Sequence, residues 1–186
     1  DDYLMKITHV IRGEEWISSL PIHVTLYNAF EWNCPIFCHL PLLLNEDKSK
    51  LSKRQGDVAV EDFLSKGYLE DALINFVSLL GWHGSDNKEI YSIDELIANF
   101  SIDRIRSSGA VFDNKKLAWF NQEYIKNTNP KELLGLIGQT INTDWDITEA
   151  MIASVQENAE TINDFKDKLK RTMDKKGSNS SLVFTT

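Results

Sequence analysis

The chain has 186 residues, 42% of them hydrophobic and 26% charged, and a formal net charge of −8. This composition excludes collagenous, mucin-like and wholly disordered proteins, because it supplies enough apolar side chains for a core. No apolar run approaches the roughly 20 residues of a membrane span, and the N-terminus lacks a signal-peptide pattern. Cys34 and Cys38 are too close to staple a domain, so we expect a soluble protein in a reducing compartment.

The first part of the chain has the pattern strand, helix, strand. Residues 7–12 are rich in β-branched side chains, which is typical of a buried strand. From Ser19 onward apolar residues recur every three or four positions, which predicts a helix that stops at Asn33. Residues 36–44 predict a second strand, made irregular by Pro41. This order implies a parallel crossover.

Helical signals dominate after residue 57. An apolar stripe over residues 73–80 is followed by Gly81, a candidate C-cap, and Ser92 with Glu95 forms a capping box. Three more helical stretches are expected: from Asp113 through Phe120, from Asn129-Pro130, and over 148–176. The Gly/Ser/Asn-rich residues 177–181 are expected to be flexible.

These elements predict an α/β part followed by a mainly α part. A doubly wound sheet needs about five or six parallel strands, so one crossover indicates an incomplete α/β unit. The apolar residues 182–184 are an unusual terminus, since they would lack packing partners. We therefore expect both ends of the chain to be cut.

A basic loop follows the second predicted strand, where ligand sites of α/β proteins usually lie. The loop, residues 45–57, carries four cations: Lys48, Lys50, Lys53 and Arg54. Lysine ammonium groups and the Ser52 hydroxyl are donors that suit a polyphosphate. The loop lacks the G-x-x-x-x-G-K pattern of a P-loop, and its alternative interpretation is a solvated basic turn.

Residues 50–54, KLSKR, resemble the KMSKS motif of class I aminoacyl-tRNA synthetases. The flanking segments resemble glutamyl-tRNA synthetase in order and spacing, from residue 1 to about residue 125. They are DYLM (2–5), ITHVIRGEEW (7–16), HLPLLL (39–44), GDV (56–58), GYL (67–69), AL (72–73), LLGW (79–82) and AVFD (110–113).

The resemblance implies three consecutive parts. Residues 1–60 would be the C-terminal part of a Rossmann-type catalytic domain with the KLSKR loop, residues 61–128 a helical stem-contact region, and residues 129–186 the beginning of a helical anticodon-binding region. The HIGH motif, which in this family lies upstream, is absent from the sequence. We therefore expect this fragment to be inactive alone.

The resemblance also implies an activity and its partners. A glutamate-tRNA ligase activates glutamate with ATP to glutamyl adenylate and transfers the glutamyl group to tRNA(Glu). ATP would be used with Mg2+ as substrate, with no protein-bound metal, no membrane partner and a monomeric parent enzyme. The implied location is the cytoplasm, most simply the bacterial cytosol, with the mitochondrial or plastid matrix as alternatives.

Site roles follow from matching the family position by position. Arg12 would hold a glutamate carboxylate, a task suited to a planar bidentate donor, and Trp16 would wall the same pocket. Glu15 would lie near the adenylate ribose and ATP, and the backbone of Leu42 and Leu43 would border the adenine.

Phosphate and RNA contacts are expected from cations, which the resemblance implies for the KLSKR loop and the local charge suggests for residues 161–176. Lys50 and Lys53 would be the catalytic lysines on the triphosphate, with Ser52 in the same ATP site. Lys53 is the better candidate for the charge that builds on the leaving pyrophosphate. The expected tRNA contacts are Arg54, Lys166, Lys170 and Arg171, the last three from a segment, 161–176, with an excess of basic residues.

Each of these residues also has an ordinary structural explanation. Arg12 could form a surface ion pair with Glu14 or Glu15, Trp16 could pack in a core, and the basic segment could be a solvated helix face. Cys34, Cys38 and His39 lack the paired spacing of a structural zinc site. The remaining histidines, His9, His23 and His83, have no nucleophile context, so a hydrolase triad has no support.

Two other functions stay open. The glutamyl-queuosine tRNA synthetase paralogue is one, although it carries no anticodon-binding helices. The other is an RNA-binding and ATP-gating module that is inactive alone. The sequence does not distinguish a ligase that rejects tRNA(Gln) from one that accepts it.

Overall fold

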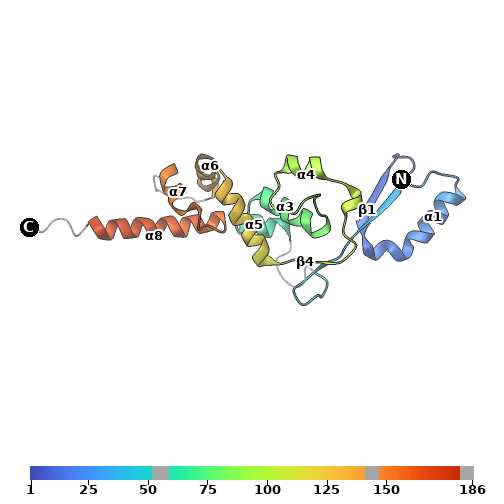
Figure 1. Ribbon diagram of the computed structural model, residues 1–186, viewed down its shortest axis with the longest axis horizontal. Helices are drawn as coiled ribbons and strands as arrows, with labels where there is room; N and C mark the ends of the chain where they lie inside the picture. Colours follow the sequence, from blue (N-terminus) through green and yellow to red (C-terminus); the bar gives the residue numbers. More distant parts are fainter. Residues whose placement is uncertain (52–58, 141–146, 181–186) are drawn as a thin grey trace, which may run out of the picture. The chain divides into compact units, whose positions relative to one another are not determined.

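The computed structural model describes residues 1–51, 59–140 and 147–180, with only the backbone described for 139–140, 166 and 173–180 (Figure 1). It is a mixed α/β structure made mostly of helices, as predicted. Residue contacts divide the chain into two compact units. The first combines residues 1–52 with 77–113, and the second combines 53–76 with 114–186.

The first unit opens with the predicted crossover. Strand β1 (His9–Gly13) is followed by a 3-10 helix, η1 (Glu14–Ser19), helix α1 (Leu20–Ala29) and strand β2 (Ile36–Leu40). The two strands pair in parallel, with Arg12 opposite His39. Strand β1 begins two residues later than expected, because the Ile7 N–H donates to the Asp2 carbonyl at 2.9 Å in an N-terminal turn.

The apolar run after β2 is interrupted at Pro41, as its composition predicted. Strand β3 (Leu43–Leu44) follows the break and pairs in parallel with β4 (Ala110–Val111), which the sequence did not predict. The backbone bonds that flank this pair run from Ala110 N to Leu42 O at 3.1 Å and from Phe112 N to Leu44 O at 2.8 Å. A two-residue strand has too little sequence for an alternating pattern, so only its distant partner defines it.

Helix α3 (Glu70–Gly81) contributes residues to both units, and α4 (Ile93–Asn99) and η2 (Ile102–Arg104) complete the first. The capping box is confirmed: Ser92 Oγ accepts from Glu95 N at 3.2 Å, and Glu95 Oε2 accepts from Ser92 N at 2.9 Å. Helix α3 ends at Gly81, where the sequence predicted its end, and Trp82 N bonds to Ser78 O at 3.0 Å in the last turn. Gly81 is the last helical residue and not a left-handed cap, since it is not among the described residues with positive φ.

The second unit is helical. Besides the start of α3 it contains α2 (Val60–Ser65), α5 (Asn114–Asn127), α6 (Pro130–Thr140), α7 (Glu149–Gln156) and α8 (Ile162–Ser180). The predicted start of α6 is confirmed, and Asn129 Oδ1 accepts from Lys131 N at 2.9 Å. The expectation of a flexible stretch was wrong for residues 177–180, which lie within α8. None of the described helices is long and apolar enough to cross a bilayer.

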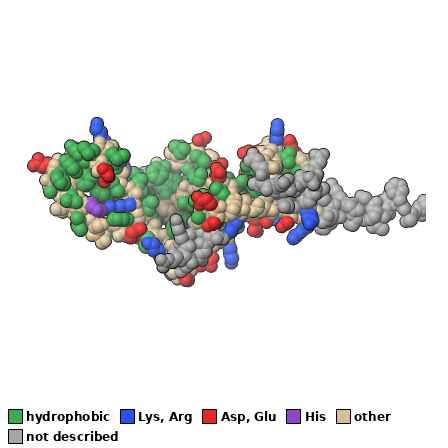
Figure 2. Space-filling model, turned by 180° about the vertical axis from the view of Figure 1, so that it is seen from behind, with side chains coloured by type: hydrophobic (Ala, Val, Ile, Leu, Met, Phe, Trp, Pro, Cys, Tyr) green, Lys and Arg blue, Asp and Glu red, His purple; other side chains and the backbone are tan. Residues whose placement is uncertain are grey.

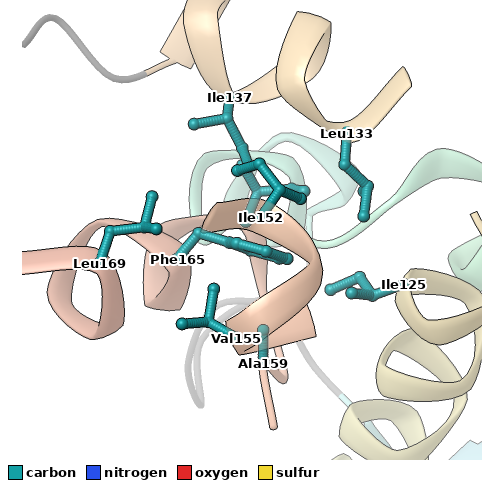
Figure 3. Packing of buried hydrophobic residues seen from close by; sticks show 9 residues of the cluster. Ile125, Leu133, Ile137, Ile152, Val155, Ala159, Phe165 and Leu169 are labelled. Atoms are coloured by element: carbon teal, nitrogen blue, oxygen red, sulfur yellow. The ribbon is translucent and has the colours of Figure 1, made fainter. Parts of the chain in front are cut away.

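A buried apolar cluster joins the last four helices (Figure 3). In the figure, Ile152 and Phe165 lie at its centre, with Leu133 and Ile137 above them. Its members are Ile125, Leu133, Ile137, Ile152, Val155, Ala159, Ile162, Phe165 and Leu169. Burial of each large side chain contributes about 1.5–3 kcal/mol, so this cluster is a large source of stability in the described helical unit.

Two buried amides satisfy backbone groups at helix ends. Asn121 Oδ1 accepts from Leu69 N at 2.7 Å, and its Nδ2 donates to Glu160 O at 2.5 Å. Gln156 Nε2 donates to the carbonyls of Ile125 and Thr128, each at 2.7 Å, where α5 ends. A helix leaves such groups without intrahelical partners, and a buried group without a partner costs about 1–3 kcal/mol.

Gly67 ends α2 in a Schellman motif. Its φ is +84°, its N–H donates to Leu64 O at 2.9 Å, and Tyr68 N donates to Phe63 O at 3.1 Å. The rings of Phe63 and Tyr68 meet edge to face with centroids 5.8 Å apart, which is the apolar contact that accompanies this motif. The Gly67 carbonyl also accepts from Ile162 N at 2.8 Å, and a Cβ at Gly67 would come within 2.8 Å of Asn163 N.

We predict that Gly67→Ala lowers the free energy of unfolding by about 1–3 kcal/mol, because Ala is strained at positive φ and its methyl group meets backbone. Urea unfolding followed by circular dichroism measures this. The matched control is Gly135→Ala inside α6, where a Cβ meets nothing within 4 Å and should be neutral or stabilise by about 0.5–1 kcal/mol. Equal effects of the two changes would show that the positive φ and the close backbone contact at Gly67 do not matter for stability.

Candidate functional site

Alternate residues of β1 and β2 form one face of the first sheet. Because successive side chains of a strand point to opposite faces, Val10 and Arg12 share a face with Phe37 and His39. A cavity of about 370 Å³ adjoins this face. Its walls are Val10, Arg12 and Phe37 of the strands, Asp1, Asp2 and Tyr3 of the N-terminus, and His23, Leu26, Tyr27, Phe30 and Trp32 of α1 and the segment after it.

Arg12 is the cationic side chain among the described residues that line this cavity. Its Nε donates to His39 Nε2 at 3.3 Å, and its Nη1 lies 3.1 Å from His23 Nδ1. The guanidinium carbon lies 5.0 Å from the Phe37 ring centre and 5.7 Å from that of Trp16. The remaining nitrogen, Nη2, is buried and has no hydrogen-bond partner among the described residues.

Aromatic side chains surround the cavity. Trp32 stacks on Tyr3 and on Phe30, with ring centres 4.2 and 4.6 Å apart. Tyr27 Oη lies 3.5 Å from Asp2 Oδ2, and desolvation together with the Asp2 charge raises the pKa of Tyr27. Figure 2 shows hydrophobic side chains covering much of the surface around α1, with a histidine beside a basic side chain. The cavity is therefore aromatic, with a cation on one wall and carboxylates on another.

The 3-10 helix after β1 places the three residues that follow Gly13. Glu14 Oε1 accepts from Leu42 N at 3.1 Å, so the carboxylate joins the end of β1 to the break at Pro41. Glu15 is exposed, and a Cβ at Gly13 would lie 2.7 Å from its carboxyl carbon. No ion pair joins Arg12 to Glu14 or Glu15 in the described chain, so the surface-pair interpretation of Arg12 was wrong.

Trp16 is 50% exposed and does not line the cavity, although its ring lies near the Arg12 guanidinium. Leu42 uses both of its backbone groups within the protein, since its N–H donates to Glu14 and its carbonyl accepts from Ala110. The Leu43 carbonyl accepts from Leu51 N at 2.8 Å. The expected roles of these residues toward a ligand stay predictions.

Lys50 is exposed and lies at the base of a tight turn. Leu44 and Lys50 form an isolated antiparallel bridge, and Asn45 N donates to Ser49 O at 2.8 Å. Asp47 Oδ1 accepts from Ser49 N at 2.9 Å and from Ser49 Oγ at 2.5 Å, and these bonds hold the pKa of Asp47 below its usual range. The other predicted residues of the loop, Ser52, Lys53 and Arg54, lie outside the described residues.

The predicted RNA-contacting cations lie on α8 in the second unit. Lys170 and Arg171 are exposed, and Lys168 lies 3.8 Å from Asp164. The side chain of Lys166 is outside the described residues. Exposed cations on one helix are compatible with phosphate contacts and equally with a solvated face, so their role also stays a prediction.

Sequence reasoning did not identify His23 and His39 as neighbours of Arg12. His39 was considered only for a metal site, and His23 only for a catalytic triad. Among the described residues, no three His, Cys, Asp or Glu side chains gather where they could hold a metal ion. The strand register was the signal that could have paired Arg12 with His39, because parallel strands place these positions side by side.

Comparison with known proteins places the chain in a family. Residues 1–119 match the family described as tRNA synthetases class I (E and Q), catalytic domain. The chain belongs to this family. The fold is therefore part of a Rossmann-like class I catalytic domain followed by helices.

This class I synthetase chain is similar in sequence to proteins named glutamate–tRNA ligase. It is 57% identical over 149 residues to a glutamate–tRNA ligase of Clostridioides difficile, and 60% identical over 128 residues to one of Prosthecochloris aestuarii. The matches cover 80% and 68% of this chain but 30% and 25% of those ligases. The chain thus spans less than a third of the length of these relatives.

Solved structures agree with the sequence relatives. A crystal structure of a glutamate tRNA ligase from Elizabethkingia meningosepticum in complex with its amino acid has a TM-score of 0.81 and 36% identity. A glutamate-tRNA synthetase from Elizabethkingia anophelis has a TM-score of 0.79 and 37% identity. They match 91% and 90% of this chain, and each match covers 38% of the solved chain.

We predict that Ser49→Ala raises the pKa of Asp47 toward its ordinary value, because the side-chain bond from Ser49 is the largest cause of the lowered value. A lowered folded pKa means that Asp47 stabilises the turn at higher pH and loses this effect as pH falls through that pKa. Carboxyl NMR titration measures it. Ser65→Ala, whose hydroxyl bonds Asp62 O instead, is the control, and an Asp47 titration unchanged by Ser49→Ala would refute the assignment.

Proposed function

We propose that this chain is the part of a glutamate–tRNA ligase that holds glutamate through Arg12 and ATP through the KLSKR loop. The complete reaction joins glutamate to tRNA(Glu) by way of glutamyl adenylate. The observation that carries the proposal is Arg12 itself, which lines a cavity of largely aromatic and apolar side chains and whose buried Nη2 has no hydrogen-bond partner among the described residues.

A carboxylate is the ligand that this arginine needs. A buried donor without a partner costs about 1–3 kcal/mol, and more when it is charged, so the guanidinium favours an acceptor from outside the chain. Arginine and carboxylate form strong charge-assisted hydrogen bonds. Ligand pockets usually have volumes of about 300–1,000 Å³, and a cavity of about 370 Å³ has room for one amino acid.

The ATP site is proposed to lie along the turn after β3. Lys50 is exposed there, and Lys53 and Ser52 continue the same motif, with Glu15 near the ribose and the backbone at Leu42 and Leu43 near the adenine. Lysine ammonium groups would bind the triphosphate, and Mg2+ would accompany ATP as part of the substrate. Because Leu42 already uses both backbone groups, Leu43 is the better candidate for direct adenine contact.

The remaining proposals concern the contacts with tRNA, the role of Trp16, and the oligomeric state and location of the parent enzyme. Arg54, Lys166, Lys170 and Arg171 are proposed to contact tRNA, with residues 61–128 near the stem and residues 129–186 in the anticodon-binding region. Trp16 would close the glutamate pocket from the 3-10 helix. The parent enzyme is proposed to be a cytoplasmic monomer. The assignments of Trp16 and Arg54 rest on the family match over residues 1–119 and on relatives named glutamate–tRNA ligase. Those of Lys166, Lys170 and Arg171 rest on the excess of basic residues in 161–176.

The alternative is an RNA-binding and ATP-gating module without its own amino-acid specificity. The Arg12 cavity favours the ligase, because gating of ATP needs no second cationic pocket. The deciding experiment uses a full-length glutamate–tRNA ligase in which this chain occupies the matching segment. Charging of tRNA(Glu) with glutamate is expected, and failure to charge it while tRNA still binds would favour the module.

In that ligase, Arg12→Ala should raise the glutamate KM by about 10- to 100-fold with little change in the ATP KM, because a charged hydrogen-bond partner of the carboxylate is lost. ATP–pyrophosphate exchange in the presence of tRNA(Glu) measures both constants. Arg106→Ala, an exposed arginine of the same unit, is the control and should leave both constants within about two-fold. A selective rise in the ATP KM would contradict the assignment of Arg12 to the glutamate site.

Lys53→Ala should lower the rate of adenylate formation by about 10²- to 10³-fold, since it removes one donor to charge that develops on the pyrophosphate. Lys50→Ala should lower it by about 10-fold. Lys48→Ala is the matched control, because Lys48 is an exposed cation of the same turn outside the motif, and it should change the rate by less than about two-fold. Single-turnover kinetics separate these outcomes. Equal rates for all three variants would contradict the proposed binding of the triphosphate by Lys50 and Lys53.

A further inference from the structure

The two hydrogen bonds of Arg12 fix the protonation of two histidines. An arginine side chain only donates hydrogen bonds. His39 Nε2 and His23 Nδ1 must therefore both accept, at 3.3 and 3.1 Å from Arg12 nitrogens. Each imidazole then carries its single proton on the other ring nitrogen, Nδ1 in His39 and Nε2 in His23, and both rings are neutral.

The two histidines approach the guanidinium from different elements. His39 is the neighbour of Arg12 across the parallel pair, and His23 comes from α1 on the same side of the sheet. Together they occupy Nε and Nη1, while the rings of Phe37 and Trp16 lie near the guanidinium. The position of the planar group is therefore set from two directions, and Nη2 is the nitrogen left without a partner among the described residues.

Neutral hydrogen-bond acceptors and carboxylates have different effects on the positive charge of Arg12. Asp or Glu at either position would orient Arg12 but would also neutralise its charge, and the site would lose most of its attraction for an anionic ligand. An imidazole accepts the same hydrogen bond and leaves the full positive charge in place. A cation held this way is oriented and still uncompensated.

We propose that His23 and His39 are positioning residues that orient Arg12 toward the carboxylate of its ligand while preserving its charge. The inference rests on the proposed function, because it assumes that Arg12 binds the substrate carboxylate. His23 also lines the cavity, but the role proposed for both histidines is to hold Arg12 in place. Each acts through Arg12, and each acts through one specific ring nitrogen.

Because each histidine accepts through one specific ring nitrogen, Asn and Gln substitutions at the two positions should have opposite effects. The Oδ1 of asparagine lies where His Nδ1 lies, and the Oε1 of glutamine lies near the place of His Nε2. His39→Gln and His23→Asn therefore keep an acceptor for Arg12. His39→Asn and His23→Gln retain an amide but place its oxygen at the wrong distance.

The experiment uses the full-length ligase that carries this chain, with glutamate, ATP and tRNA(Glu) as the substrates. The matched amides should keep the glutamate KM within about three-fold of the unmutated ligase, and the mismatched amides should raise it by about 10- to 100-fold. The ATP KM and the kcat at saturating glutamate should change much less. His9→Asn and His9→Gln are controls on the same strand, since the His9 side chain is exposed and its Nδ1 bonds to Thr8 Oγ1 rather than to Arg12.

The outcomes separate the inference from the function on which it rests. Matched and mismatched amides with equal effects on the glutamate KM would overturn the positioning role while the ligase remains active. An unmutated ligase that does not activate glutamate would overturn the proposed function and the inference together. Dependence on the amide position supports the role, because general damage to folding would not follow that position.

A second measurement needs no variant. Nitrogen NMR of histidine side chains in the unmutated ligase distinguishes the two neutral tautomers. The inference requires the Nδ1–H form for His39 and the Nε2–H form for His23, with both rings neutral at pH 7.5. A positively charged ring or the opposite tautomer at either histidine would overturn it, even if every variant failed to fold.

Discussion

The parallel pairing of β1 with β2 is the constraint on which the candidate site depends. Its register sets Arg12 beside His39, and the crossover brings α1 and His23 to the same face. Because side chains alternate along a strand, a slip of one residue would turn Arg12 to the opposite face. That face adjoins a separate apolar cavity of about 250 Å³, lined by Ile11, Leu40 and Trp82 among others. The same two strands therefore border a cationic cavity on one side and an apolar one on the other.

Short-range bonds connect this sheet to the turn that carries Lys50. Glu14 reaches from the end of β1 to the Leu42 amide, and β3 begins at the next residue. The Asp47–Ser49 bonds then close the turn, and the bridge between Leu44 and Lys50 fixes where the lysine leaves it. Arg12 of the proposed glutamate site and Lys50 of the proposed ATP site thus both come from residues 1–52 of the first unit.

The sequence predicted the features that depend on neighbouring residues. The crossover, the irregularity at Pro41, the capping box at Ser92 and the start of α6 all follow from local patterns, and all are confirmed. Strand β4 depends on a partner more than sixty positions away, so local rules failed there. For the site, the motif gave Arg12 and Lys50. The histidine partners of Arg12 required three-dimensional contacts, and the roles of Ser52, Lys53 and Arg54 stay predictions.

The buried amides of the helical unit have a consequence for how its helices can move. Apolar contacts are not directional, whereas a hydrogen bond needs its donor and acceptor at a defined distance and angle. Asn121 and Gln156 instead grip backbone atoms at defined places near helix ends, and a small axial shift would break these bonds without offering new partners. Buried apolar contacts thus stabilise the unit as a whole, and the hydrogen bonds of these two amide side chains favour one position of the helices along their axes.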